Sequence, residues 1–90
     1  MDRKDIKLIL KNPYKDILDY VLSIVNLSEQ EKETITLVDI KGNTEEYASN
    51  ELNLTIRRIQ MIRQSAYKKL DKAWSNSSLI KVLIKMLKEE

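Results

Sequence analysis

Four side chains that can bond to the edges of DNA bases lie close together between positions 57 and 64. Arg57 and Arg58 carry guanidinium groups, and Gln60 and Gln64 carry amides. Arg can form two hydrogen bonds with guanine, and Gln two with adenine, when a helix presents them in the major groove. Because residues three or four apart lie on one face of a helix, this spacing predicts a surface that reads bases.

Most catalytic and metal-binding chemistry is excluded by composition. The chain has no His and no Cys, which removes imidazole catalysis, thiol chemistry, disulfides and the usual zinc ligands. Apart from the run at 29–33 and the acids at 89–90, closely spaced carboxylates occur as pairs such as those at 16 and 19 and at 45 and 46. Without a base or nucleophile beside them, we expect no enzyme activity, no metal and no cofactor.

The charges of the chain are unevenly distributed, although the formal net charge is only +2. The segment from Leu27 to Asn53 contains seven acids and two bases, whereas the segment from Leu54 to Ala73 contains six bases and one acid. The six bases are Arg57, Arg58, Arg63, Lys68, Lys69 and Lys72. A basic segment of this kind is typical of proteins that bind a polyanion.

The elements that carry these side chains are expected to be helices. One Gly and one Pro leave little room for hairpins, and Leu, Ile, Lys and Glu favour helix. Ninety residues suit a single domain, 1–90, built as an all-α bundle of about five to six helices. We expect helices over 5–10, 13–25, 29–41, 45–52, 56–73 and 79–88.

Residues suited to helix ends support these boundaries. Side chains that can cap a helix N-terminus precede four of the helices, at Asn12, Ser28, Thr44 and Thr55. Ser28 and Glu31 have the spacing of a capping box, and Pro13 fits a first helical position. Gly42 and Asn53 are placed where a left-handed residue ends a helix.

Apolar spacing predicts which faces are buried. The stripe on the long fifth helix comprises Ile59, Ile62, Ala66, Leu70 and Ala73. In the short helix before it, Tyr47, Ala48 and Leu52 are available for burial. Trp74 and the four tyrosines are scattered and are not interleaved with bases, so we expect them in the core. The polar run that follows Ala73, from Trp74 to Ser78, is expected to break the helix.

A short helix, a tight turn at Asn53 and a long basic helix predict a helix-turn-helix, with Ser49 small enough for close approach of the two helices. The second helix would read DNA with Thr55 to Gln64. The expected contact residues are Thr55, Ile56, Arg57, Arg58, Gln60, Met61, Arg63 and Gln64, with Lys68 and Lys69 further along the helix, where contacts to phosphate are natural.

Five motifs give the segment Leu27 to Leu70 a family resemblance. They are Leu27-Ser28-Glu29-Gln30-Glu31, Gly42, the turn Leu52-Asn53-Leu54-Thr55, Ile59, and Ala66-Tyr67-Lys68-Lys69-Leu70. In these residues the chain resembles region four of bacterial sigma factors and the related sigma-like helix-turn-helix regulators. It departs from the family at Ala48 and Ser49, at Asn53 in place of glycine, and at Met61.

The resemblance implies a transcriptional regulator that binds double-stranded DNA, and it leaves open whether RNA polymerase is also contacted. Ninety residues leave no room for the polymerase-gripping domain of a complete sigma factor, so we expect a truncated regulator of the kind found in a phage or mobile element. The target sequence and the direction of control stay open.

Three segments organise the chain in this interpretation: N-terminal helices over 1–26, the sigma-like core over 27–74, and an apolar helix over 77–90. The last helix, Leu79 to Lys88, has a wide apolar face, which favours packing against the N-terminal segment together with homodimer formation. Association with a membrane is the weakest alternative, and the short, charged apolar stretch near the N-terminus is no signal peptide. We therefore expect a cytoplasmic protein.

Two further functions remain open from the sequence. One is a DNA-packaging module similar to a phage small terminase subunit, which also joins a helix-turn-helix to an oligomerising segment. The other is an interaction module that binds polymerase or a sigma factor without contacting DNA. A dimer favours the regulator, a ring of eight or more subunits favours packaging, and salt-dependent DNA binding would exclude the interaction module.

Overall fold

The computed structural model describes residues 1–89, and within them all regular structure is helical, which confirms the expected all-α class. The chain divides into two units, Leu27–Tyr67 and a second made of Met1–Asn26 with Lys68–Glu90. The first boundary coincides with the predicted start of the core segment. The second falls inside a long helix, α5 (Ile56–Ser75), so this helix contributes residues to both units.

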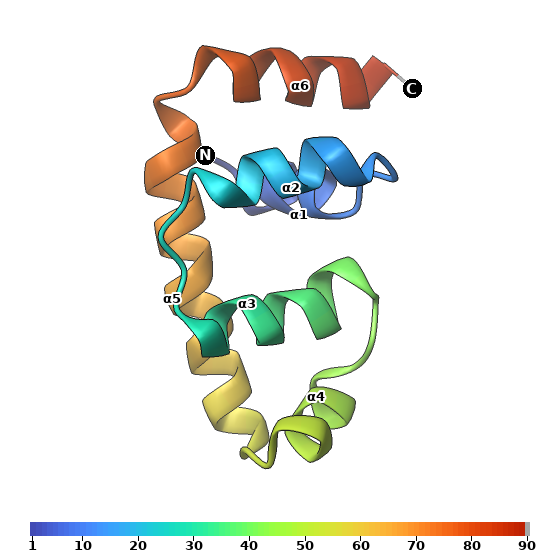
Figure 1. The fold of residues 1–90 in the computed structure, drawn as a ribbon, viewed down its shortest axis with the longest axis vertical. Helices are drawn as coiled ribbons and strands as arrows, with labels where there is room; N and C mark the ends of the chain where they lie inside the picture. The colour runs from blue at the N-terminus through green and yellow to red at the C-terminus, as the bar shows by residue number, and fades with distance from the viewer. Residues whose placement is uncertain (90) are drawn as a thin grey trace. The chain divides into compact units, whose positions relative to one another are not determined.

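The unit Leu27–Tyr67 contains α3 (Glu29–Ile35), a π-helical segment η1 (Thr36–Ile40), α4 (Glu45–Leu52) and the N-terminal part of α5 (Figure 1). The predicted capping box is confirmed. The Ser28 hydroxyl accepts from the Glu31 amide at 3.2 Å, and the Glu31 carboxylate accepts from the Ser28 amide at 2.8 Å. This reciprocal pair satisfies two amides that would otherwise lack partners at the start of α3.

The expectation that the third helix continues as an ordinary α-helix to position 41 is wrong. From Thr36 to Ile40 the backbone is π-helical, and the Lys41 amide bonds to the Thr36 carbonyl at 2.9 Å, five residues back. Such a turn accommodates one extra residue and changes the direction of the side chains within it. Gly42 ends the segment with φ of +78°, in the left-handed conformation expected for it.

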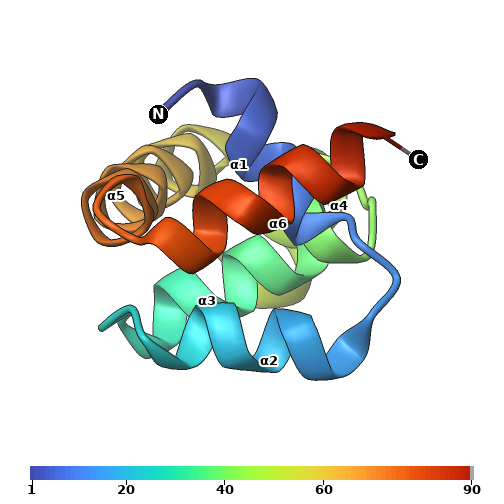
Figure 2. The same ribbon diagram turned by 90° about the horizontal axis from the view of Figure 1, so that it is seen from above.

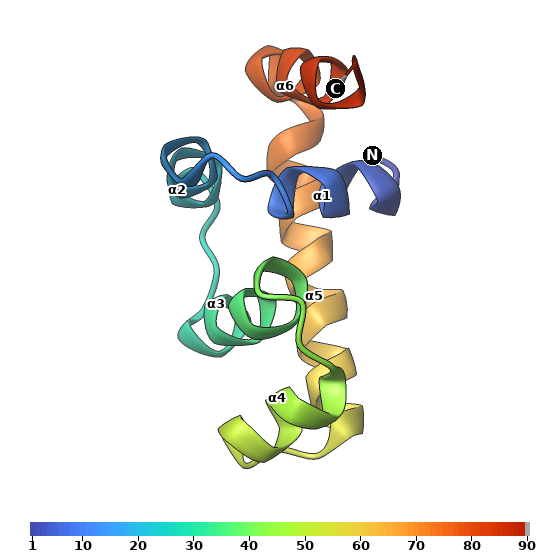
Figure 3. The same ribbon diagram turned by 90° about the vertical axis from the view of Figure 1, so that its right-hand side faces the viewer.

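The predicted turn between α4 and α5 is confirmed in its backbone and caps (Figure 3). Thr44 caps α4 through the Tyr47 amide at 3.0 Å, and Thr55 caps α5 through the Arg58 amide at 3.1 Å. Asn53 has φ of +55°, the left-handed region that its short polar side chain tolerates. The Tyr47 side chain is exposed, contrary to the burial expected for it, and the same correction applies to Tyr14 and Tyr20, whereas Tyr67 is buried.

The other unit contains α1 (Arg3–Leu10), α2 (Lys15–Ser23), the C-terminal part of α5 and α6 (Ser78–Glu89). α6 packs against α1 (Figure 2). The largest fully buried side chains of this unit are those of Ile6, Ile9, Leu10, Val21, Leu70, Trp74 and Ile80. The indole of Trp74 donates to the Val21 carbonyl at 3.0 Å, so its one polar atom is satisfied within the core.

Several predicted boundaries of this unit differ from the structure, and side-chain bonds explain two of the differences. α2 begins at Lys15, because Asn12 folds back instead of capping it: its amide donates to the Ile9 carbonyl and its oxygen accepts from the Tyr14 amide at 2.9 Å. α5 continues through Ser75 instead of breaking at Trp74, because the buried indole holds the last turn in place. Among residues 1–89, no helix has the length and apolar character needed to cross a bilayer.

Candidate nucleic-acid interface

The N-terminal half of α5 presents a polar face with one apolar side chain in it. Arg57, Gln60, Met61 and Gln64 follow the three- and four-residue spacing of a single helical face, and all four are exposed. Met61 keeps 51% of its surface exposed. The opposite face contains the buried Ile59 and Ile62, so burial of the stripe fixes which side of the helix is presented outward.

Exposed groups also flank this face. Arg58 is exposed beside it, and Ile56, the first residue of α5, keeps 44% of its surface exposed. No acidic residue occurs between Glu51 and Asp71, so the helix itself contributes no negative charge near the two arginines. The arrangement can donate hydrogen bonds to base edges or phosphates and can offer an apolar contact to a thymine methyl group.

Arg63 does not belong to this outward face. Its guanidinium donates to both oxygens of the Asp39 carboxylate, at 2.8 and 3.1 Å, and forms a third bond with Glu45 at 2.8 Å. The Asp39 side chain is only 4% exposed, and that of Arg63 is 22% exposed. Arg63 was one of the expected contact residues, but here it neutralises a buried acid and joins α5 to η1 and α4.

Tyr67 completes this cluster. Its hydroxyl donates to the Asp39 carboxylate at 2.5 Å, and the Arg63 guanidinium lies 5.7 Å from the centre of its ring. The bonds to Asp39 raise the pKa of Arg63 above its usual value, although burial opposes them. Burial, followed by the bond to Asp39, raises the pKa of the Tyr67 hydroxyl. Both groups are therefore held in their protonated forms around one carboxylate.

The Asp39 cluster is not predicted by the sequence, although one signal for it is present. Asp39 interrupts an otherwise apolar run from Leu37 to Ile40, which is an unfavourable place for an acid unless it has a partner. The partner could not be identified from spacing, because Arg63 and Tyr67 follow 24 and 28 residues later.

Gln60 is exposed but already has one bond. Its amide nitrogen donates to a Glu45 oxygen at 3.2 Å, while the other oxygen of Glu45 bonds to Arg63. Glu45 therefore lies directly beside the outward face of α5 and fixes the side-chain amide of Gln60. Glu45 does not bond to the side-chain carbonyl oxygen of Gln60 or occupy its second N–H.

The remaining expected contact residues have other positions. The Thr55 hydroxyl is engaged as the cap of α5. Lys68 and Lys69 are exposed on the part of α5 that belongs to the other unit.

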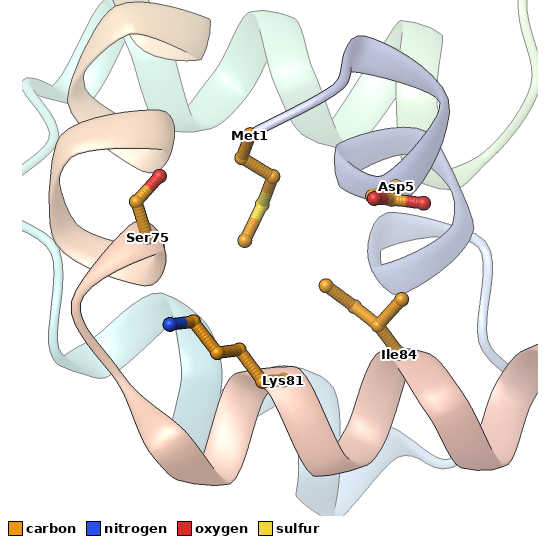
Figure 4. A pocket seen from close by; sticks show the side chains of 5 residues that line it. All are labelled: Met1, Asp5, Ser75, Lys81 and Ile84. Atoms are coloured by element: carbon orange, nitrogen blue, oxygen red, sulfur yellow. The ribbon is translucent and has the colours of Figure 1, made fainter.

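A separate pocket of about 300 Å³ lies in the other unit, lined by Met1, Asp5, Ser75, Lys81 and Ile84 (Figure 4). Two of its charged groups form structural ion pairs: the Met1 amino group bonds to Asp71 at 2.7 Å, and Asp5 bonds to Lys88 at 3.0 Å. The bond to the amino group, with a second bond from Ser75, lowers the pKa of Asp71. Within the described part of the chain, no group of three potential metal ligands occurs here or elsewhere.

No family model matches the chain, and neither a curated protein nor a solved structure matches it.

Proposed function

We propose that this protein is a sigma-like transcriptional regulator that binds double-stranded DNA and reads it with the N-terminal half of α5. The observation that carries the proposal is the exposed face of Arg57, Gln60, Met61 and Gln64, presented directly after a capped turn. A short helix and a tight turn before such a helix are the arrangement that places a reading helix in the major groove. The resemblance of the sequence to sigma region four supports the same assignment.

Distinct roles follow from the chemistry of each side chain. Arg57 and Gln64 lie at the centre of the face and would form hydrogen bonds with guanine and adenine respectively. Met61, between them along the chain, would contact a thymine methyl group. Arg58 lies on the flank and suits a phosphate, as do Lys68 and Lys69 further along α5. Arg63 is removed from the expected set, because a base contact would require it to abandon the buried Asp39.

The proposal includes two protein partners. RNA polymerase follows from the sigma-like resemblance. A second copy of the chain, paired through the segment Leu79 to Lys88, follows from the small number of bases that one reading helix can cover.

Selection from random duplex DNA, followed by titration of the selected site at several salt concentrations, tests the proposal. Affinity should fall steeply with salt, because Arg and Lys displace counterions from phosphates. Arg57→Ala should cost about 1–3 kcal/mol on the selected site and relax its sequence at one position. Arg58→Ala should weaken binding to selected and random duplexes alike.

Lys32→Ala is the matched control, since Lys32 is an exposed base of the same unit on a different helix, and its loss should leave affinity nearly unchanged. Absence of duplex affinity at low salt would refute DNA binding and favour the polymerase-interaction module. Binding that comes from a ring of eight or more subunits would favour the packaging module instead.

A further inference from the structure

An apolar groove separates α2 from α6 in the unit formed by 1–26 and 68–90. It has a volume of about 330 Å³. Its walls are the apolar side chains of Ile17, Tyr20, Val21, Leu79, Ile80 and Leu83, with Asp16 at one edge. Tyr20 and Leu79 keep 52% and 65% of their surfaces exposed, so the groove is lined by large apolar groups that the chain itself leaves uncovered.

A stripe on α6 continues this exposed surface. Leu79, Val82 and Met86 have the spacing of one helical face, and Val82 and Met86 are 56% and 59% exposed. Ile80 and Ile84, which belong to the wide apolar face of the last helix, are buried in the core of their own unit. The exposed apolar face of α6 that remains for a partner is therefore made of Leu79, Val82 and Met86. This face adjoins the groove, because Leu79 also lines it.

The groove and the exposed stripe of α6 are flanked by opposite charges. Asp16 lines the groove and Asp19 is exposed on the same helix, whereas Lys85 is exposed on α6 three residues after Val82 of the stripe. Two copies related by a two-fold axis can each offer an acidic α2 and a basic α6 to the other. The same acids would oppose an anionic membrane surface, which makes a lipid occupant unfavourable.

We infer that the groove between α2 and α6 is the site at which a second copy of this chain docks, with the Leu79, Val82 and Met86 stripe of each copy lying in the groove of the other. This places the apolar stripes and grooves of both copies out of water and pairs Lys85 of one copy with the Asp16 and Asp19 region of its partner. The inference rests on the proposed function only in one respect, which is that a dimer would supply the second reading helix. Self-association itself can be measured without DNA.

Sedimentation of the full chain in the absence of DNA tests this interface. The wild-type protein should sediment as a dimer, and Val82→Lys and Met86→Lys should each shift it to the mass of a monomer. Both positions are exposed, so circular dichroism should show unchanged helix content. Tyr47→Lys is the matched control: it replaces a 46% exposed aromatic residue of the other unit and should leave the dimer intact.

Charge reversal tests the pairing across the groove. Asp16→Lys and Lys85→Glu should each weaken self-association at least about tenfold, because each homodimer then places like charges together twice. An equimolar mixture of the two variants should recover a heterodimer of wild-type stability. A wild-type monomer at high concentration, a ring, or a Val82→Lys protein that stays dimeric would overturn the proposed interface.

The same variants separate this inference from the proposed function. If the groove is the interface, monomeric Val82→Lys should retain salt-dependent binding to random duplex and lose affinity for the selected site. If the wild-type dimer forms as described but binds no duplex, DNA binding fails while the interface stands.

Discussion

Arg63 and Asp39 lie 24 residues apart in the sequence, and the guanidinium of the first bonds to both oxygens of the second. This is the bidentate geometry in which Arg and a carboxylate interact most strongly. Since Asp39 belongs to η1 and Arg63 to α5, the pair fixes the rotation of α5 about its own axis within the unit Leu27–Tyr67. That rotation determines which side chains of the helix face outward.

Replacing Arg63 with Ala should destabilise the protein by about 3 kcal/mol, because it leaves the Asp39 carboxylate buried without its counter-charge. Arg57→Ala, on the outward face of the same helix, should change stability by less than about 0.5 kcal/mol. Urea unfolding followed by circular dichroism measures both. Similar losses for the two variants would mean that the Arg63 cluster does not support the fold.

The Tyr67 hydroxyl should make stability fall at alkaline pH. Its pKa in the folded protein is raised above the ordinary value of 10.0. The folded state therefore keeps the proton to higher pH than the unfolded state, so this stabilisation is complete below pH 10 and is lost as pH rises above it.

Tyr67→Phe is the variant that isolates this effect. It should lower the free energy of unfolding at pH 7 by about 1.5–3 kcal/mol, as loss of a hydrogen bond to a charged group does. The difference from wild type should then shrink as pH rises beyond 10. Unfolding titrations of both proteins at several pH values decide the matter, and a difference independent of pH would contradict the assignment.

Two threonines should respond in opposite ways to the same substitution. The Thr34 hydroxyl is buried and has no hydrogen-bond partner among residues 1–89, so Thr34→Val should stabilise the protein by about 1 kcal/mol. The Thr44 hydroxyl caps α4, so Thr44→Val should destabilise it by about 1 kcal/mol. Thermal and urea unfolding would show the two shifts, and a loss of stability in both variants would indicate that Thr34 has an unrecognised partner.

Glu45→Gln should increase the affinity for DNA if α5 enters the groove as proposed. The Glu45 carboxylate lies beside Gln60 on the outward face, where it would repel phosphates. Its neutralisation should strengthen binding to all duplexes alike at low salt, measured by fluorescence anisotropy. Glu33→Gln, which neutralises an exposed acid on α3, should increase DNA affinity less. Equal increases for the two variants would mean that the DNA does not contact the outward face of α5.

Much of the fold follows from local signals in the sequence. Ser28, Thr44 and Thr55 each cap the helix expected, and Gly42 and Asn53 adopt the left-handed conformations expected. The predicted bounds of α4 coincide with those observed. These features depend on bonds between residues a few positions apart, so spacing alone identifies them.

The features that the sequence did not predict depend on contacts between distant residues. Arg63 was grouped with the outward bases because its charge is visible in the sequence, whereas its partner Asp39 is identified only by folding. The continuation of α5 through Trp74 likewise depends on a bond to Val21, 53 residues away. The spacing of apolar residues does not predict the π-helical turn either, because this turn contains one residue more than the α-helical turn on which that spacing is based.

The π-helical segment Thr36–Ile40 makes the number of residues in this stretch as important as their identity. Removing one residue from it would restore ordinary α-helical winding and leave the residues after it in register, because a π turn is one residue wider than an α turn. The side chains inside the segment would change direction, among them Asp39, whose carboxylate binds Arg63 and Tyr67. Functional descendants of this chain should therefore tolerate many substitutions at 36–38 but no single-residue deletion there.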